Sequence, residues 1–555
     1  MDETLKRRVG LRREEDPFAF SKRAPAVPIS SNLFHSDPVL TACLDATLDQ
    51  DTEDDLMALG AYWGSAEAQE VARIAVKFGP SWRRDDDDGE RVDQIDLHPA
   101  YHALLNRSVQ SGLLSSAWED SEVTRQHRLR AATLLFASGC ERGHLLPVTS
   151  THAAIASLAY APDLEGELFP LIAARRYDRR PIHHDAKDSV LITLAIAERQ
   201  QGADRSVITT RGELTAGDSV RITGEKTNVA APSCDMALVL AKTADGPTVA
   251  MVPRYAPDNR DAVVIDGMCR KGGLDAQAFA TLSFRDARGH LVGEPGRGLQ
   301  VLRDVRTLTQ LDLTIITAGA VRGALTKMAD FLRAQTVGSG SGLTDPQTAR
   351  LVADLALTSA AQTALAIRLA AAFDQAFERD GDHAVARVLT PASRIFGMKS
   401  AALLLTEVRD TFSIAAADPL HPVSRIPRDL VTLAHWDSSA EDAARDLVAL
   451  ITRDETVLSD ALDELGADLG SQNADLIDRT AALGREAIAD PGLARALAEQ
   501  LAMVGAASAM RRNLPRVVAD AFMSSRLRGG YTAQYGTLDS RFDPSALIEF
   551  IVAED

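Results

Sequence analysis

The chain has 555 residues, which is enough for three or four domains with cores of their own. Hydrophobic residues make up 45% and charged residues 25%, as in ordinary globular proteins, and an aromatic share of only 5% beside abundant Ala and Leu favours helices. The net charge of −18 argues against nucleic-acid binding through a general electrostatic field, because neutralising phosphates needs clustered Lys and Arg.

The N-terminal segment, residues 1–28, is polar and charged and contains three prolines, so we expect a mobile tail. It lacks an apolar core of signal-peptide length, and no later stretch reaches the roughly 18 uncharged apolar residues of a membrane span. The four cysteines lie far apart without metal-ligand spacing, which is typical of reduced thiols in a cytoplasmic protein; they are Cys43, Cys140, Cys234 and Cys269. We therefore expect a cytoplasmic protein with no membrane segment.

The next part of the chain, residues 29–185, is predicted to be a helical N-terminal domain, because apolar residues recur at helical spacing from Ser36 to about Ala174. Within it, Asp85–Asp88 and the following Gly89 indicate a solvated loop. A calcium site would need ligands that alternate with spacers, and that alternation is absent.

His183, His184 and Asp185 stand at the end of this domain and raise the possibility of a metal site. Adjacent side chains on one strand or loop point apart, however. The interpretation we favour is an exposed linker into the next domain, and we assign no metal ligands.

A period of two replaces the helical period across residues 186–298, which predicts a middle β domain. Short strands are expected there between Gly, Pro and Asp turns, at Ser219–Thr223, Met236–Leu240, Thr248–Val252 and Thr281–Phe284.

Helical spacing returns over residues 299–453 and predicts a four-helix bundle. Residues 454–555 are predicted to form a further helical C-terminal domain, with helices to about Arg528. The four bundle helices are expected at Val301–Arg333, Pro346–Arg379, Ala384–Asp410 and Asp437–Arg453.

Several short strings lie along the chain in one order, together with the order of domains given above. They are Ser31–Leu33, His98–His102, Trp118–Asp120, Glu198–Asp204, Gly224–Lys226, Val252–Arg254, Gly293–Gly298, Leu501–Arg512 and Arg526–Gly530. In these strings the chain resembles the acyl-CoA dehydrogenase superfamily, and within it the AidB-like branch of alkylation-response proteins, over about residues 30–535. The resemblance implies the acyl-CoA dehydrogenase fold and an FAD-dependent oxidoreductase.

In that family a carboxylate removes the α-proton of an acyl thioester while the β-carbon passes a hydride to the flavin. The base follows an aromatic residue just before the last bundle helix, and this place reads Trp436-Asp437 here. The resemblance thus gives Asp437 the catalytic role, although Asp is one methylene shorter than Glu. The alternative is that Asp437 caps the following helix, since Asp is a favoured N-cap residue.

The flavin contacts implied by the resemblance are changed at several positions. The string that gives the flavin a hydroxyl and backbone donors has Ala197, Glu198, Gly202 and Ala203, so both of its hydroxyls are gone. The motif that stacks an aromatic residue on the isoalloxazine and adds a further hydroxyl has Thr227 and Ala230 at its two positions.

The family's arginine for the pyrophosphate corresponds to Gln335, and another expected near Gln310 is also missing. The Gly-Gly-x-Gly that approaches the adenosine reads Asp410-Thr411-Phe412-Ser413. Each lost hydrogen bond is worth on the order of 1 kcal/mol, so we expect weakened or lost FAD binding.

Three functions remain open at this point. The first is a divergent FAD-dependent dehydrogenase, acting on an acyl thioester or an unusual small molecule, that assembles as a homodimer or homotetramer. The second is a non-catalytic scaffold, or the silent subunit of a heteromer with an active acyl-CoA dehydrogenase homologue.

The third is AidB-like DNA binding through the C-terminal domain. Arg511, Arg512 and Arg516 could share a helix face and touch phosphates, with Arg526 and Arg528 just beyond. Acids outnumber bases in this domain, so we favour a solvated charged surface and do not expect nucleic acid as a partner.

Overall fold

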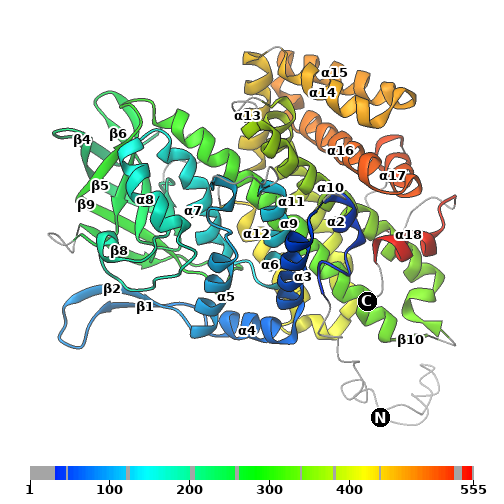
Figure 1. Ribbon diagram of the computed structural model, residues 1–555, viewed down its shortest axis with the longest axis horizontal. Helices are drawn as coiled ribbons and strands as arrows, with labels where there is room; N and C mark the ends of the chain where they lie inside the picture. Colours follow the sequence, from blue (N-terminus) through cyan, green and yellow to red (C-terminus); the bar gives the residue numbers. More distant parts are fainter. Residues whose placement is uncertain are drawn as a thin grey trace, which may run out of the picture.

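The computed structural model describes residues 32–44, 48–119, 126–199, 207–256, 262–337, 340–378, 383–436, 439–454, 456–529, 535 and 541–552. These residues are mostly helical, with β strands concentrated in the middle of the sequence. Figure 1 shows the β-rich region at one end, long helices through the centre and the C-terminal helices at the other end. The predicted tail, residues 1–28, lies outside the described residues.

The N-terminal region is helical, as predicted. Helices α6 and α7 are buried around nearly their whole circumference, and Ser65 caps α4 by accepting a hydrogen bond from the Ala68 N–H. The helices are α2 (Pro38–Cys43), α3 (Gln50–Gly64), α4 (Ala66–Lys77), α5 (Pro99–Gln110), α6 (Gln126–Cys140), α7 (Leu145–Leu158) and α8 (Pro162–Ala173), with 3-10 turns η2 (Ser116–Trp118) and η3 (His184–Ala186).

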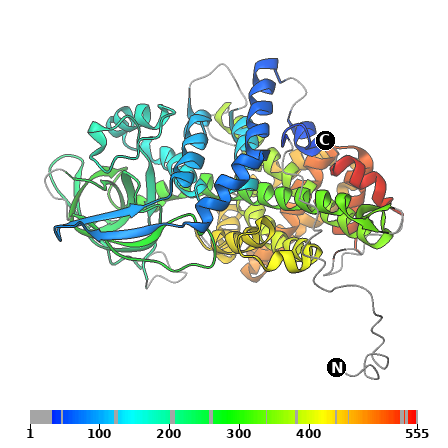
Figure 2. The same cartoon turned by 90° about the horizontal axis from the view of Figure 1, so that it is seen from below.

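A β hairpin interrupts these helices, which corrects the prediction of an all-helical segment. Strands β1 (Ser81–Asp85) and β2 (Arg91–Asp96) pair antiparallel around an exposed turn, where Gly89 takes a φ of +83°. The hairpin docks onto the β region, because the Asp93 carboxylate accepts a hydrogen bond from the Ile265 N–H at 3.0 Å. Figure 2 shows it, in blue, lying along that region.

The middle region forms a seven-stranded sheet that closes on itself, because β6 pairs with β4 and also with β7. Closure removes the free edges of the five strands in this ring, while β3 and β8 each pair on one side only among the described residues, and the result is the expected barrel-like domain. Every predicted strand falls inside an observed one. The strands are β3 (Ile192–Ala195), β4 (Arg211–Leu214), β5 (Ser219–Ala230), β6 (Met236–Thr243), β7 (Gly246–Pro253), β8 (Val263–Met268) and β9 (Phe279–Val292).

The central helices match the predicted bundle except near its end. A short helix, α12 (Pro422–Leu433), was not predicted, and the last helix begins at Ala440. The others are α9 (Gly298–Ala334), α10 (Pro346–Glu378), α11 (Ala384–Phe412) and α13 (Ala440–Arg453), with the small pair β10 (Thr336–Val337) and β11 (Gly340–Ser341) and 3-10 turns η4 (Gly342–Thr344) and η5 (Ser413–Ala417). Pro346–Ala376 is long and apolar enough to cross a membrane, but 94% of its most apolar window is buried within the protein, as in a core helix.

The C-terminal region packs onto α10 and α11 through α16, whose residues 504–510 are all buried. It consists of α14 (Val457–Leu469), α15 (Ala474–Ala489), α16 (Ala494–Asn513), α17 (Arg516–Phe522), a π turn η8 (Met523–Leu527) and α18 (Pro544–Ile551), with 3-10 turns η6 (Ser471–Asn473) and η7 (Pro491–Leu493). Helix α18 was not predicted. It lies against α10 and α2 and so returns the end of the described chain to the N-terminal helices.

One buried ion pair joins the N-terminal helices to the bundle. The Arg130 guanidinium on α6 donates to both oxygens of Asp312 on α9, at 2.5 and 2.8 Å, and its Nε donates to the Leu113 carbonyl. Both side chains are 1% exposed or less. Two parallel bonds fix the register of α6 against α9, because a bidentate pair tolerates little sliding.

We predict that Asp312→Ala lowers the free energy of unfolding by about 3–5 kcal/mol, because it leaves the Arg130 charge buried without a partner. Chemical denaturation measures this. Arg221→Ala removes the exposed pair with Asp286 and serves as the control, with an expected change under about 1 kcal/mol. Similar losses in the two variants would contradict a structural role for the buried pair.

Candidate functional site

The main cavity lies where the β region, the N-terminal helices and the bundle meet, and its volume is about 1180 Å³. The end of α7, the first part of α9, the end of α10, the start of α11 and α13 all contribute to it, together with Ile196, which directly follows β3, and Leu240 on β6. A cavity of this size accommodates a ligand larger than most drug-sized molecules.

One part of the cavity wall is apolar. It includes Leu302, Leu308, Phe373, Ala386 and Leu450, which come from four different helices. Removing an alkyl chain from water against such a wall is favourable, at roughly 0.8 kcal/mol per buried CH₂.

The other part of the wall carries four arginines. Arg306 pairs with Asp446 at 2.5 Å and Arg387 pairs with Asp454 at 2.8 Å. The other two, Arg303 and Arg453, are exposed, and neither has a carboxylate within 4.0 Å among the residues that the structure describes.

A tyrosine hydroxyl is bonded to a carboxylate at the same wall. The Tyr160 hydroxyl donates to Asp304 at 2.5 Å. Burial, followed by this hydrogen bond, raises the pKa of Tyr160 to about 12. The phenol therefore stays protonated at neutral pH and occupies one oxygen of the Asp304 carboxylate with its hydrogen bond.

These four arginines were not predicted as site residues from the sequence. Arg303 and Arg306 lie three residues apart on one face of α9, which is a detectable spacing. Arg387 on α11 and Arg453 on α13 are far from them in the sequence, and folding brings all four arginines to the same cavity.

The predicted flavin wall lies beside this cavity, and most of its side chains are engaged elsewhere. Ala197 is exposed next to the cavity residue Ile196. Glu198 is buried, and its carboxylate accepts bonds from Lys226 at 2.7 Å and from the backbone and hydroxyl of Thr209. Glu198 thus ties β5 to the segment after β3.

The two remaining wall positions offer no free hydroxyl. The Thr227 hydroxyl lies 3.2 Å from that of Thr281 and bonds to it, and the Thr227 N–H donates to the Ala197 carbonyl. Ala230 is 2% exposed, and its carbonyl accepts from the Thr193 hydroxyl.

The predicted pyrophosphate position is far from the cavity within one chain. Gln335 ends α9, where its N–H donates to the Phe331 and Leu332 carbonyls. It lies about 37 Å along the helix from Gln310, which lines the cavity. The structure therefore does not bring Gln335 to the other predicted site residues in the same chain.

The counterpart of the family's glycine-rich segment is the end of a helix. Helix α11 continues through Phe412, whose ring stacks on Phe331 at 4.6 Å between centroids. The expected conflict between Asp410–Ser413 and the adenosine end of a flavin stays a prediction.

Three predicted site residues, Gly202, Ala203 and Asp437, lie outside the described residues. The alternative role for Asp437, as N-cap of the last bundle helix, is wrong. Ser439 caps α13 and forms a capping box with Asp442. The catalytic role of Asp437 stays a prediction.

The described residues do not fit FAD in the family's mode. The wall has no aromatic side chain at Thr227, the carboxylate of Glu198 is used internally, and no side-chain hydroxyl remains at Ala197 or Ala230. An isoalloxazine would find few polar partners on this surface.

The C-terminal arginines that suggested DNA contacts are largely paired. Arg526 is bonded to the buried Asp354 at 2.5 Å, Arg528 to Asp475 at 3.1 Å and Arg511 to Asp520 at 2.8 Å. These charges help to hold the C-terminal helices together.

Comparisons with known proteins agree with this architecture. Residues 25–179 match the family model of the adaptive response protein AidB N-terminal domain. The chain is 27% identical over 514 residues to the putative acyl-CoA dehydrogenase AidB of Escherichia coli K12, covering 91% of this chain and 94% of that protein.

Solved structures show the same fold. Caenorhabditis elegans ACDH-11 in complex with C11-CoA matches with a TM-score of 0.80 at 16% identity, covering 99% of this chain and 94% of that one. An acyl-CoA dehydrogenase complexed with FAD from Bacillus anthracis matches with a TM-score of 0.63 at 15% identity, covering 88% and 87%.

The closed β domain between helical layers, together with these matches, defines a protein with the acyl-CoA dehydrogenase fold. Among proteins of this fold the chain is similar to AidB, since residues 25–179 match the AidB N-terminal family model and the chain aligns with AidB over most of its length.

We predict that Glu198→Gln destabilises the protein by about 3–5 kcal/mol at neutral pH, because it leaves Lys226 buried without its partner. Burial alone would raise the pKa of Glu198, but the bonds from Lys226 and Thr209 lower it to about 2. A lowered folded-state pKa means that the stabilisation is complete above the unfolded pKa, about 4.3, and is lost as the pH falls towards 2.

Denaturation of wild type and Glu198→Gln between pH 7 and pH 3 measures this difference. It should shrink below about pH 4.3. The exposed Glu213→Gln is the control and should show little difference at any pH. If the difference in stability between wild type and Glu198→Gln is independent of pH, the charged pair is not the cause of that difference.

Proposed function

We propose that this chain is a divergent acyl-CoA dehydrogenase-like protein that binds an acyl thioester in the main cavity without flavin-dependent turnover in the family's mode. The observation that carries the proposal is the cavity of about 1180 Å³ with an apolar wall and two arginines, Arg303 and Arg453, for which the described residues offer no carboxylate partner. It suits a ligand with an alkyl chain and an anionic head.

In this proposal the apolar part of the cavity wall binds the alkyl chain and the arginine-bearing part binds the anionic head. Leu302, Phe373 and Leu450 would cover the alkyl chain and exclude water. Arg303 and Arg453, which have no carboxylate partner among the described residues, would meet phosphate oxygens through charge-assisted bonds. The pairs made by Arg306 and Arg387 hold α13 against α9 and α11 and keep the cavity in shape.

The similarity to ACDH-11, whose structure contains C11-CoA, supports an acyl-CoA as the ligand class. In this proposal the chain acts as a homo-oligomer, or as the silent subunit beside an active acyl-CoA dehydrogenase homologue. Its location in the cytoplasm is part of the same proposal.

Flavin-dependent dehydrogenation is the second candidate. A structural neighbour is complexed with FAD, and Asp437 stands at the position of the family's base. In this candidate Asp437 removes the substrate's α-proton. The poor fit of the described flavin wall is the reason for placing it second.

We predict that purified full-length protein binds decanoyl-CoA, and that Arg303→Ala and Arg453→Ala each raise the Kd about tenfold. A lost charge-assisted bond costs roughly 1.5–3 kcal/mol, and 1.4 kcal/mol is tenfold in Kd. Isothermal titration calorimetry measures both constants, and the loss should diminish at high salt.

The control is Arg285→Ala, an exposed arginine on β9 that should leave the Kd unchanged. Wild-type protein that shows no saturable binding, or cavity variants that bind as well as wild type, would overturn the proposed ligand.

A further inference from the structure

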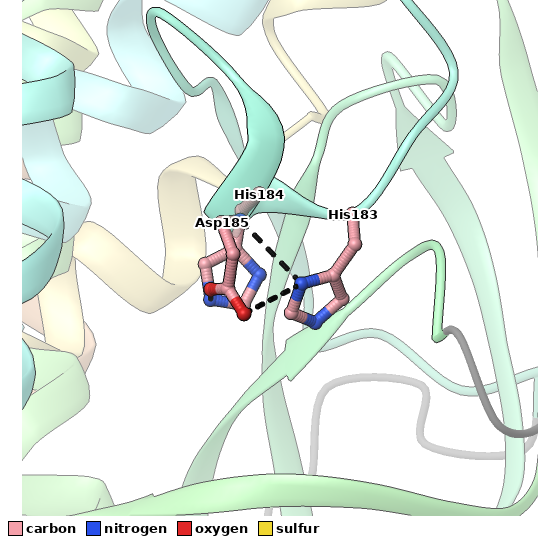
Figure 3. A group of neighbouring side chains, drawn as sticks. All are labelled: His183, His184 and Asp185. Atoms are coloured by element: carbon pink, nitrogen blue, oxygen red, sulfur yellow. Dashed lines mark hydrogen bonds and ion pairs between the residues drawn. The ribbon is translucent and has the colours of Figure 1, made fainter.

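Three neighbouring residues between α8 and β3 converge on one point (Figure 3). A nitrogen of His183, a nitrogen of His184 and a carboxylate oxygen of Asp185 all lie within 4.8 Å of one another. The expectation that these side chains point apart is therefore wrong. The chain is extended at His183, with φ −58° and ψ 144°, and then tightens into the 3-10 turn η3, which brings the side chain of Asp185 back beside His183.

A fourth side chain comes from a different helix. The Glu167 carboxylate on α8 lies 2.8 Å from His184 Nε2. One Asp185 oxygen lies 3.2 Å from the same nitrogen, and the other lies 3.2 Å from His183 Nδ1. Two imidazoles and two carboxylates thus share one small volume.

These separations suit a tetrahedral cation. Bonds of about 2.0–2.1 Å from zinc to N and O ligands place neighbouring ligand atoms about 3.3 Å apart. The two carboxylates also supply the negative charge that a divalent cation needs, and the imidazoles supply nitrogen ligands that zinc accepts readily.

The competing arrangement is a proton on His184 Nε2 that is donated to Glu167. That tautomer suits Nδ1 of the same ring, which is buried and lacks a hydrogen-bond partner in the described part of the chain. A single proton, however, cannot serve Glu167 and Asp185 together. His183 Nδ1 accepts only a long bond, 3.4 Å, from the Asp185 N–H, so its lone pair is weakly engaged.

The backbone around the cluster is held in place before any ion binds. Arg180 donates to the Ala186 carbonyl at 3.2 Å, and Lys187 forms a buried 2.5 Å pair with Asp235. The second Asp235 oxygen accepts from the Leu191 N–H at 2.8 Å. A site on a rigid turn loses little entropy when it is occupied.

We propose that His183, His184, Asp185 and Glu167 form a divalent metal site of the zinc class. The ion links α8 to the segment that leads into β3 and so fixes the junction between the helical and β regions. Its role is structural, because it lies apart from the residues that line the main cavity.

Titration of chelator-treated full-length protein with ZnCl₂, followed by calorimetry, tests this site. Wild type should bind one equivalent with a Kd below about 1 µM. Asp185→Asn should weaken binding by at least about tenfold, and because the Asp185 side chain is 70% exposed the variant should fold normally. Glu167→Gln should have a similar effect.

Two matched variants serve as controls. His290→Ala on β9 and Glu165→Gln on α8 remove the same residue types outside the cluster and should bind zinc like wild type. Co²⁺ in place of Zn²⁺ should give the visible absorption of a tetrahedral site in wild type and lose it in Asp185→Asn. Absence of saturable zinc binding, or equal affinities for wild type and Asp185→Asn, would overturn the proposal.

Discussion

The packing of α9 is the constraint on which the rest of the structure depends. Over its 37 residues this helix contacts α6, α7, α10, α11, α12 and β7, and its first part forms a side of the main cavity. The bidentate bond between Arg130 and Asp312 sets where α6 lies along it. A helix displaced by one turn would move Arg303 and Arg306 by about 5.4 Å relative to the helices that face them.

The strings that carry the family resemblance have structural roles here. Glu198 and Lys226 form a buried pair, and Arg254 donates to the carbonyls of Val263 and Asp93, which joins the β domain to the hairpin. Gly224 has a φ of +151°, and a Cβ there would lie 2.6 Å from Thr210. These residues maintain the fold whether or not a flavin binds, so the resemblance and the flavin chemistry can separate.

Much of the fold could be predicted from the sequence. The three longest helices follow from regular apolar spacing, and β5, β6, β7 and β9 fall where the alternation predicted strands, whereas β3, β4 and β8 were not predicted. The hairpin β1–β2 was missed because its strands are short, charged residues are frequent in both, and β1 is mostly exposed, so the pattern resembles a charged loop. Helix α12 begins at Pro422 and is only twelve residues long, and it was not recognised as a separate helix.

Less of the site could be predicted, because it depends on distances between separate elements. The changed flavin positions could be identified residue by residue from the sequence. Only the structure shows that the Glu198 carboxylate forms an ion pair with Lys226. The cavity arginines come from α9, α11 and α13, which are far apart in the sequence, and His184 meets Glu167 only because the chain turns back after α8. Backbone turns decide whether adjacent side chains meet, and one turn at His183 reversed the expectation there.

The absorbance spectrum of the purified full-length protein tests the central claim most directly, namely that this fold is kept without the family's flavin site. We predict a colourless protein that acquires no flavin absorbance after incubation with excess FAD and gel filtration, while it still binds decanoyl-CoA. A yellow protein with one FAD per chain, whose flavin is bleached when an acyl-CoA is added, would contradict the account.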